Sequence, residues 1–151
     1  SDTDDPCLMY YNNIVTKISN NQHVPTVYSL YLDKDNGFYL TVLERLDEPT
    51  FKDGEVCDLC RDFCIGYITS DDFVISAEKY SSYIPNPSKM LDLLIRIKNL
   101  AETQKVKIDL HRGNFMLRDT ILVITDPWSG DYLSDDSDLS VWADENIYQT
   151  T

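Results

Sequence analysis

The sequence is poor in basic residues, in glycine and in long apolar runs. Only 13 of its 151 residues are Lys or Arg, against 26 Asp or Glu, which gives a net charge of −13. A surface with this charge repels nucleic acid and anionic membranes, so we expect no direct contact with either. The longest apolar runs, such as Ile121–Ile124, are far too short to cross a bilayer. These features argue against a nucleic-acid-binding protein and against a membrane span in this sequence.

The basic residues are also unevenly placed. The last of them is Arg118, and from Asp119 to Thr151 the chain has eight acids and no Lys or Arg. A charge run of this kind is usually a solvated surface. The alternative is a surface that attracts a basic partner, including a protein groove built for DNA.

Four cysteines raise the question of a metal site. Cys57, Cys60 and Cys64 have the spacing C-x2-C-x3-C, whereas a structural zinc site usually has four ligands in two spaced pairs. The same positions lie on one face of a helix, where free cysteine packs as a small apolar side chain. We therefore expect them in the core, with a metal or cluster site as the alternative. Because no secretory signal is visible, we expect reduced thiols and a cytoplasmic location.

Apolar periodicity predicts an α+β fold, with one domain over residues 1–151 and an acidic segment from about 127. A helix is expected over about 8–19, with Pro6 suited to its start. Two β-rich runs, at 27–32 and 38–46, flank the turn DKDNG and predict a hairpin.

A helix that carries the cysteines is expected near 56–69, followed by a mixed stretch at 70–87 that contains two prolines. Pro87 opens an amphipathic helix whose buried side is expected to contain Met90, Leu91, Leu93, Leu94, Ile97 and Leu100. The runs NFMLR and ILVIT predict a second hairpin with a tight turn at Asp119-Thr120. We expect the final 25 residues to be acidic and irregular.

The stretch KIDLHRGNFMLRDTILVITDP, at 107–127, has the residues that phosphoryl transfer requires. That reaction needs a carboxylate to take the hydroxyl proton and oxygen ligands that hold magnesium on the phosphates. Asp109 is followed by Asn114 five residues on, and Asp126 closes the run ILVIT. Alone, each residue would be an ordinary turn cap. Their combined spacing after a long amphipathic helix favours a kinase-type centre.

DLHRGN resembles the catalytic loop of the protein-kinase-like superfamily, in the form common among atypical and bacterial members, and DPW stands where the DFG motif would be. The segment HVPTVYSLYLDKDNGFYLTVLERLDE is similar to the one that leads through two strands to the interlobe hinge. More narrowly, IDLHRGNFM…ITDP resembles the early host-takeover serine/threonine kinases of lytic podophages. The resemblance covers about residues 8–128. It implies a truncated kinase-like core, made of a hinge hairpin, helices and a catalytic-loop hairpin.

By this resemblance Asp109 would be the catalytic base, and Asn114 and Asp126 would bind magnesium. The hinge, with Glu44 and Leu46, would contact ATP.

The departures from the family pattern concern mainly the nucleotide clamp. Lys107 replaces the usual histidine, and Pro127-Trp128 replace Phe-Gly. None of the five glycines forms G-x-G-x-x-G, no V-A-I-K-like strand precedes the first helix, and no Glu lies between Cys7 and Gln22. We therefore expect ATP and Mg²⁺ to bind weakly, if they bind.

Two functions are consistent with these residues. One is an active or fragmentary serine/threonine kinase that transfers phosphate from ATP to host proteins. The other is a degenerate kinase-like phage protein that binds and inhibits a basic, nucleic-acid-handling host protein, such as a polymerase, nuclease or restriction-type complex, in the host cytoplasm. The second accounts for both the missing clamp and the charge, and we favour it on the sequence.

The acidic segment would supply the contact with such a partner. Charge gives fast, salt-sensitive association, and aromatic groups such as Trp128 would add lasting affinity. The alternative is that these aromatics fold the tail back over the hairpin and cover its apolar face. The residues expected to bind the partner are Asp131, Asp135, Asp136, Asp138 and Trp142.

Overall fold

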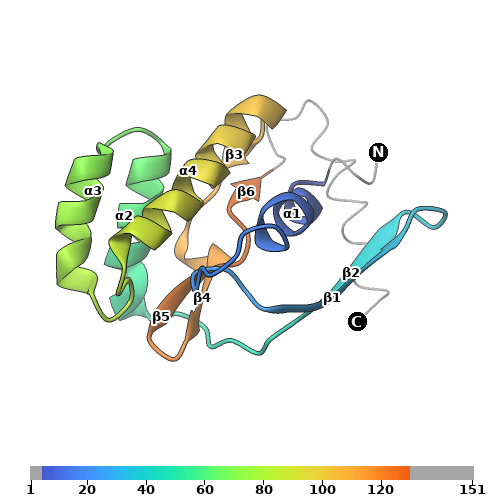
Figure 1. The fold of residues 1–151 in the computed structure, drawn as a ribbon, viewed down its shortest axis with the longest axis horizontal. Coiled ribbons are helices and arrows are strands. Elements are labelled where there is room, and N and C mark those ends of the chain that lie inside the picture. The colour runs from blue at the N-terminus through green and yellow to red at the C-terminus, as the bar shows by residue number, and fades with distance from the viewer. Residues whose placement is uncertain (1–4, 130–151) are drawn as a thin grey trace.

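Four α-helices and three two-stranded antiparallel sheets make up residues 5–129, the part of the chain that the computed structural model describes (Figure 1). The helices are α1 (Pro6–Tyr10), α2 (Gly54–Cys64), α3 (Ser70–Ala77) and α4 (Pro87–Gln104). The strands are β1 (Val27–Asp33), β2 (Phe38–Leu43), β3 (Lys107–Ile108), β4 (Phe115–Arg118), β5 (Ile121–Ile124) and β6 (Trp128–Ser129). The predicted α+β class is confirmed, as are the hairpins β1–β2 and β4–β5.

Side-chain caps set the starts of the helices. Asp5 accepts a hydrogen bond of 3.0 Å from the Leu8 N–H and caps α1. Thr69 accepts one of 3.1 Å from the Asp72 N–H and caps α3. Helix α4 begins with Pro87, whose missing N–H is no loss in the first turn.

Three expectations about these elements need correction. The first helix begins at Pro6, whose place at its start was expected, but it passes into a π-helical turn, Tyr11–Val15, and ends before residue 19. The stretch 70–87 was expected to be mixed, yet it contains α3, whose cap and acidic first turn complement the helix dipole. The cysteine helix ends at Cys64 rather than near residue 69, just before Gly66 at φ 89°.

The core lies where α4 packs against α2 and α3. Met90, Leu93, Leu94 and Ile97 of α4 are fully buried, as the spacing predicted, while the flanking expected positions are only half-buried. No helix within residues 5–129 is both long and apolar enough to cross a membrane.

The predicted burial of the cysteine face is confirmed. Cys57, Cys60 and Cys64 point from α2 into the core, and the Cys64 thiol lies 3.7 Å from the Leu94 carbonyl oxygen. Burial raises the pKa of Cys57 and Cys64 to about 12, so both remain thiols at neutral pH.

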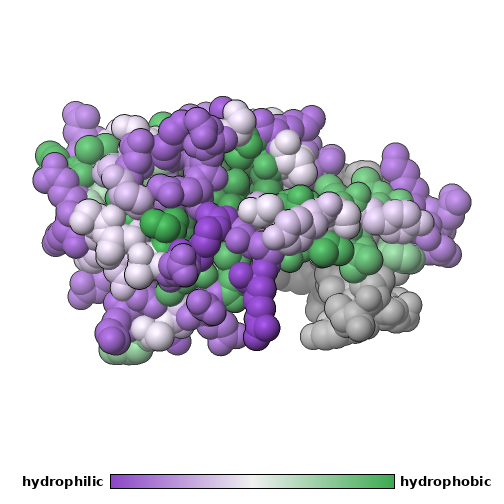
Figure 2. All heavy atoms as spheres, turned by 60° about the horizontal axis from the view of Figure 1, so that its bottom comes forward, coloured by the Kyte–Doolittle hydropathy of each residue, from purple (hydrophilic) through white to green (hydrophobic). Residues whose placement is uncertain are grey.

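The β1–β2 hairpin projects from this body (Figure 1). Its turn uses Gly37 at φ 73°, a backbone angle that favours glycine. Tyr28 is 68% exposed and Tyr31 56%, and Leu32 and Val42 are also exposed. Figure 2 shows hydrophobic surface along the hairpin and hydrophilic surface at its tip. In the described part of the chain, no further strand pairs with either edge.

Candidate functional site

Nested strand pairing brings two distant loops together. The chain runs through β3, a loop at 109–114, β4, β5, a turn at 125–127 and β6. Because β4 pairs with β5 and β3 pairs with β6, the loop and the turn must lie side by side. The Asp109 N–H donates to the Pro127 carbonyl at 2.8 Å, and the Thr125 N–H donates to the Asn114 carbonyl at 3.0 Å. The fold therefore places the three predicted catalytic-type residues in one region.

Asn114 and Asp109 are in direct contact. The Asn114 amide nitrogen donates to the Asp109 carbonyl oxygen at 2.6 Å and to Asp109 Oδ2 at 3.2 Å. The Asn114 carbonyl in turn lies 3.3 Å from the Asp126 N–H, which donates to it. Asn114 thus fixes the position of the carboxylate that the sequence singled out as a base, and of the backbone at Asp126.

His111 is a neighbour of this pair. Its Nδ1 accepts from the Gly113 N–H at 3.0 Å, and its Nε2 lies 3.2 Å from the Asn114 amide nitrogen. Nε2 lies 3.8 Å from Asp109 Oδ2. The loop thus places an imidazole next to the Asp109 carboxylate.

Asp126 is held in an environment that opposes its charge. Burial, followed by repulsion from Asp5 and Asp109, raises the pKa of its carboxyl to about 7. Its Oδ1 is buried and forms no hydrogen bond within residues 5–129. An unpartnered buried carboxylate oxygen is costly, which points to a cation or a proton as its partner.

Helix α1 and the turn that follows it form one wall of the site. The Tyr10 hydroxyl donates to the Ile124 carbonyl at 2.6 Å, and the Tyr11 hydroxyl donates to the Thr125 carbonyl at 2.8 Å. These two bonds position the backbone just before Asp126. Sequence reasoning missed both tyrosines, because nothing local shows which carbonyls a tyrosine will reach.

Sequence reasoning also missed Asp5, a buried carboxylate near Asp126. It is only 8% exposed, burial raises its pKa, and the Tyr39 hydroxyl donates to its Oδ1 at 3.4 Å. Its sequence signal, Asp before Pro at a helix start, predicts a cap but does not predict a carboxylate near Asp126.

The two predicted hinge residues have different surroundings. The Glu44 carboxylate accepts from the Arg118 guanidinium, with Arg118 Nε at 3.0 Å from Oε2, and from the Thr26 N–H at 2.9 Å. Arg118 holds the pKa of Glu44 low, at about 2. That carboxylate is therefore engaged in the fold, and Leu46 is half-buried. Asp47 pairs through its backbone with Leu117, which places the segment against β4.

The oxygen atoms of Asn114 and Asp126 suit magnesium, which prefers hard oxygen ligands. The buried, unpartnered Oδ1 of Asp126 supports this fit. Within residues 5–129, however, no three His, Cys, Asp or Glu side chains are arranged to hold a metal ion. Two protein ligands leave most of an octahedral shell to water and phosphate oxygens, so a metal here would be bound mainly together with a phosphate ligand.

Part of the predicted partner surface is corrected by the structure. Trp128 was expected to belong to an irregular segment from about 127 and to anchor an interface, but it is 3% exposed and starts β6. Its Nε1 donates to the Ile97 carbonyl at 3.2 Å. Trp128 is a core residue because β6 pairs with β3, and this pairing closes the segment that carries the site. The remaining predicted partner residues lie outside the described residues: Asp131, Asp135, Asp136, Asp138 and Trp142.

Gly113 keeps the His111 ring in place. A Cβ atom at residue 113 would lie 2.8 Å from His111 Cε1 and 3.0 Å from its Nδ1. We expect Gly113→Ala to move the ring away from Asp109, which changes the His111 Hε1 signal in NMR spectra. The chain has one other histidine, His23, which is fully buried and serves as an internal reference. Gly54→Ala, where nothing lies within 4 Å, is the matched control. An unchanged His111 signal in the Gly113 variant would contradict this geometry.

Comparison with known proteins gives no match: no family model, no curated protein and no solved structure is significantly similar to the chain. The function must therefore be argued from the site itself.

Proposed function

We propose that this chain carries a reduced phosphotransfer centre of the protein-kinase type, in a truncated kinase-like core. The observation that carries the proposal is the contact of Asn114 with Asp109 and with the backbone of Asp126. In kinases a catalytic base, an asparagine and an aspartate act on one nucleotide. Asp109, Asn114 and Asp126 occur in the same order and with similar spacing in this chain. Asp109 would accept the hydroxyl proton of a serine or threonine, and Asn114 and Asp126 would hold Mg²⁺.

The same proposal implies weak ATP binding and slow turnover. Phosphoryl transfer depends on positioning the γ-phosphate, and the sequence offers neither a glycine-rich loop nor the strand lysine that would do so. Bound Mg²⁺ would supply the positive charge that neutralises the phosphates. Asp5, which repels the ionised form of Asp126, would make the metal-free site less stable than the loaded one.

Titration with magnesium and ATP tests the proposal. We expect weak, magnesium-dependent ATP binding by calorimetry, which Asn114→Ala reduces at least about tenfold because one of two protein ligands is lost. Slow phosphorylation of a serine substrate is expected to fall on the order of a hundredfold in Asp109→Asn, which removes the proton acceptor. Asp92→Asn, an exposed carboxylate on α4, is the matched control. ATP binding that is unaffected by magnesium and by Asn114→Ala would refute the site.

A second candidate function is suggested by the charge. We propose that the acidic C-terminal segment binds a basic host protein that handles nucleic acid, and so inhibits it. The observation in favour is the complete absence of Lys and Arg after Arg118, in a chain of net charge −13. Such a segment would compete with DNA or RNA for a positively charged groove.

Neutralising three carboxylates tests this second function. With Asp135, Asp136 and Asp138 changed to Asn, capture of a basic partner is expected to weaken most at low salt, because screening already suppresses charge attraction at high salt. Thermal stability should be unchanged in the same variant. Undiminished capture at low salt would leave the segment as a solvated surface only.

A further inference from the structure

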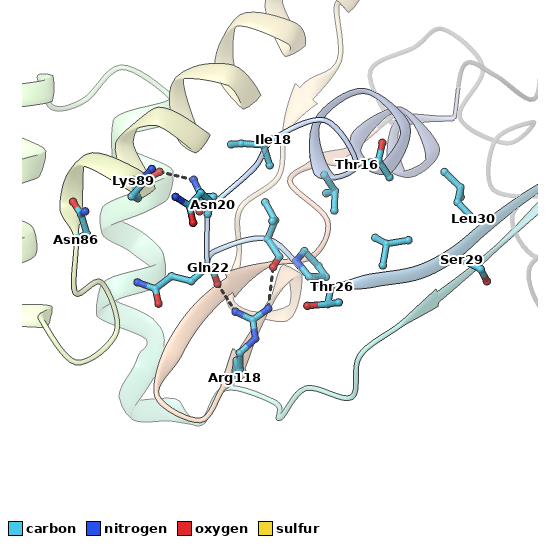
Figure 3. A pocket seen from close by; sticks show the side chains of 15 residues that line it. Thr16, Ile18, Asn20, Gln22, Thr26, Ser29, Leu30, Asn86, Lys89 and Arg118 are labelled. Carbon is cyan, nitrogen blue, oxygen red and sulfur yellow. Dashed lines mark hydrogen bonds between the residues drawn. The ribbon is translucent and has the colours of Figure 1, made fainter.

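A groove lined in part by Arg118 is not used by the proposed functions. It has a volume of about 850 Å³ and lies between the loop that precedes β1, the first turn of α4 and β1 itself (Figure 3). None of its lining residues belongs to the candidate site at Asp109, Asn114 and Asp126. It therefore needs an explanation of its own.

One wall of the groove is a strand edge. Val27, Ser29 and Leu30 of β1 line it, and β1 pairs with β2 alone among the described strands. The other edge of β1 thus offers backbone N–H and C=O groups that a further strand can pair with. A two-stranded sheet is marginal by itself, so a third strand would add stability.

The rest of the lining is mostly polar, and its apolar part consists of Val15, Ile18, Val24 and Pro25. Asn20, Gln22 and Asn86 present side-chain amides, which form no hydrogen bond within residues 5–129. Small-molecule sites are mostly apolar and enclosed, which does not describe this open groove. An extended polypeptide, by contrast, has one donor and one acceptor at nearly every residue, and free amides can satisfy both.

The charge of the groove selects among peptides. Its ionisable side chains are Lys89 and Arg118, and none of the described residues that line it is acidic. Arg118 is engaged with Glu44 and with the carbonyls of Gln22 and Val24, whereas Lys89 forms no ion pair in the described part of the chain. Lys89 is therefore the one lining cation without a carboxylate partner among the described residues, and its charge favours an acidic side chain beside it.

We propose that this groove binds an extended peptide segment of another protein, which adds as a strand to the outer edge of β1 and places an acidic side chain beside Lys89. The backbone ladder supplies affinity, and the lysine supplies the preference for a carboxylate. The partner chemistry differs from that of the basic protein expected at the acidic segment, so the two surfaces are independent.

A synthetic peptide tests the proposal on the full chain. The probe is a capped, fluorescent peptide of about eight residues, the length of a strand, which alternates valine and threonine and ends in glutamate. We expect saturable binding by fluorescence anisotropy and slower hydrogen exchange of the β1 amides. Replacing the glutamate by glutamine, or Lys89→Glu in the protein, should each weaken binding about tenfold, as expected for one charge-assisted contact. Lys52→Glu, an exposed lysine outside the groove, should change binding by less than about twofold.

Changes in the peptide backbone test strand pairing without altering the protein. N-methylation of one alternate set of peptide amides, the set that faces β1, should weaken binding about tenfold, and methylation of the other set should not. Equal binding of both methylated peptides and the parent would overturn the proposal, as would equal binding of the glutamate and glutamine peptides. Protection of β1 that appears on concentrating the protein without peptide would identify a second copy as the occupant, and would also overturn it.

Discussion

Replacing Asp126 by asparagine is expected to raise the free energy of unfolding by about 2 to 4 kcal/mol at pH 8 in the absence of divalent metal. The buried carboxyl has a pKa of about 7 in the folded protein and an ordinary value of 3.8. Its ionised form is therefore disfavoured by folding. The loss of unfolding free energy that this carboxyl causes is absent below its unfolded pKa. It grows as the pH rises between 3.8 and about 7, and it is complete above that range.

Urea denaturation with a chelator at pH 5 and pH 8 checks this prediction. The gain from Asp126→Asn over the wild type should be larger at pH 8, because only there is the wild-type carboxyl fully ionised. Asp58→Asn, which changes a largely exposed carboxylate on α2, should give a small change that hardly depends on pH. A gain for Asp126→Asn that is equal at both pH values would contradict the assignment of a raised pKa. If Asp126→Asn also weakens magnesium binding, the native carboxylate lowers stability because the site needs it, as functional residues often do.

Replacing Trp128 by alanine is expected to destabilise the protein by about 3 to 5 kcal/mol, which is a large part of a typical domain's stability. The indole is buried, donates to the Ile97 carbonyl, and packs edge-on against the Tyr10 ring with centroids 5.8 Å apart. Its loss opens a cavity between α4, α1 and β3. It also leaves the carbonyl of Ile97 without its side-chain donor.

The conservative variant separates packing from hydrogen bonding. Trp128→Phe retains most of the apolar volume but loses the indole N–H, so about 1 to 2 kcal/mol is expected. Tyr28→Ala removes an aromatic ring that is 68% exposed, and its effect should be small, on the order of 0.5 kcal/mol. Denaturant titration measures all three. If Trp128→Ala behaved like Tyr28→Ala, the tryptophan would be a surface residue, as its expected role in a partner interface requires.

Local signals were sufficient for most of the elements. The turn around Asn36-Gly37 predicted the first hairpin, and the proline at its start predicted α4. The apolar spacing of Met90, Leu93 and Ile97 predicted the buried face of the same helix. Each of these signals acts over a few residues. The helix α3 was missed although Thr69 and the two aspartates after it form a clear start signal. Pro85 and Pro87 lie beyond the end of α3 and do not interrupt it.

The site depended on contacts that no local pattern contains. The spacing of Asp109, Asn114 and Asp126 predicted that they would meet, since a hairpin joins the two ends of the stretch. The burial of Trp128 follows from the pairing of β3 with β6, two strands of two residues each, which is too short to leave a sequence signal. The proximity of Asp5 to Asp126 is a tertiary effect across most of the chain.

The hydrogen bond from Tyr10 to Ile124 joins residues 114 positions apart. During synthesis, α1 has no strand to dock on until β5 has left the ribosome. This wall of the site therefore combines a segment near the start of the described chain with one near its end. Closing so long a loop is entropically slow, whereas α2, α3 and α4 can pack with their neighbours first. The helical half should consequently act as a folding template, and the catalytic-type loop should acquire its geometry last.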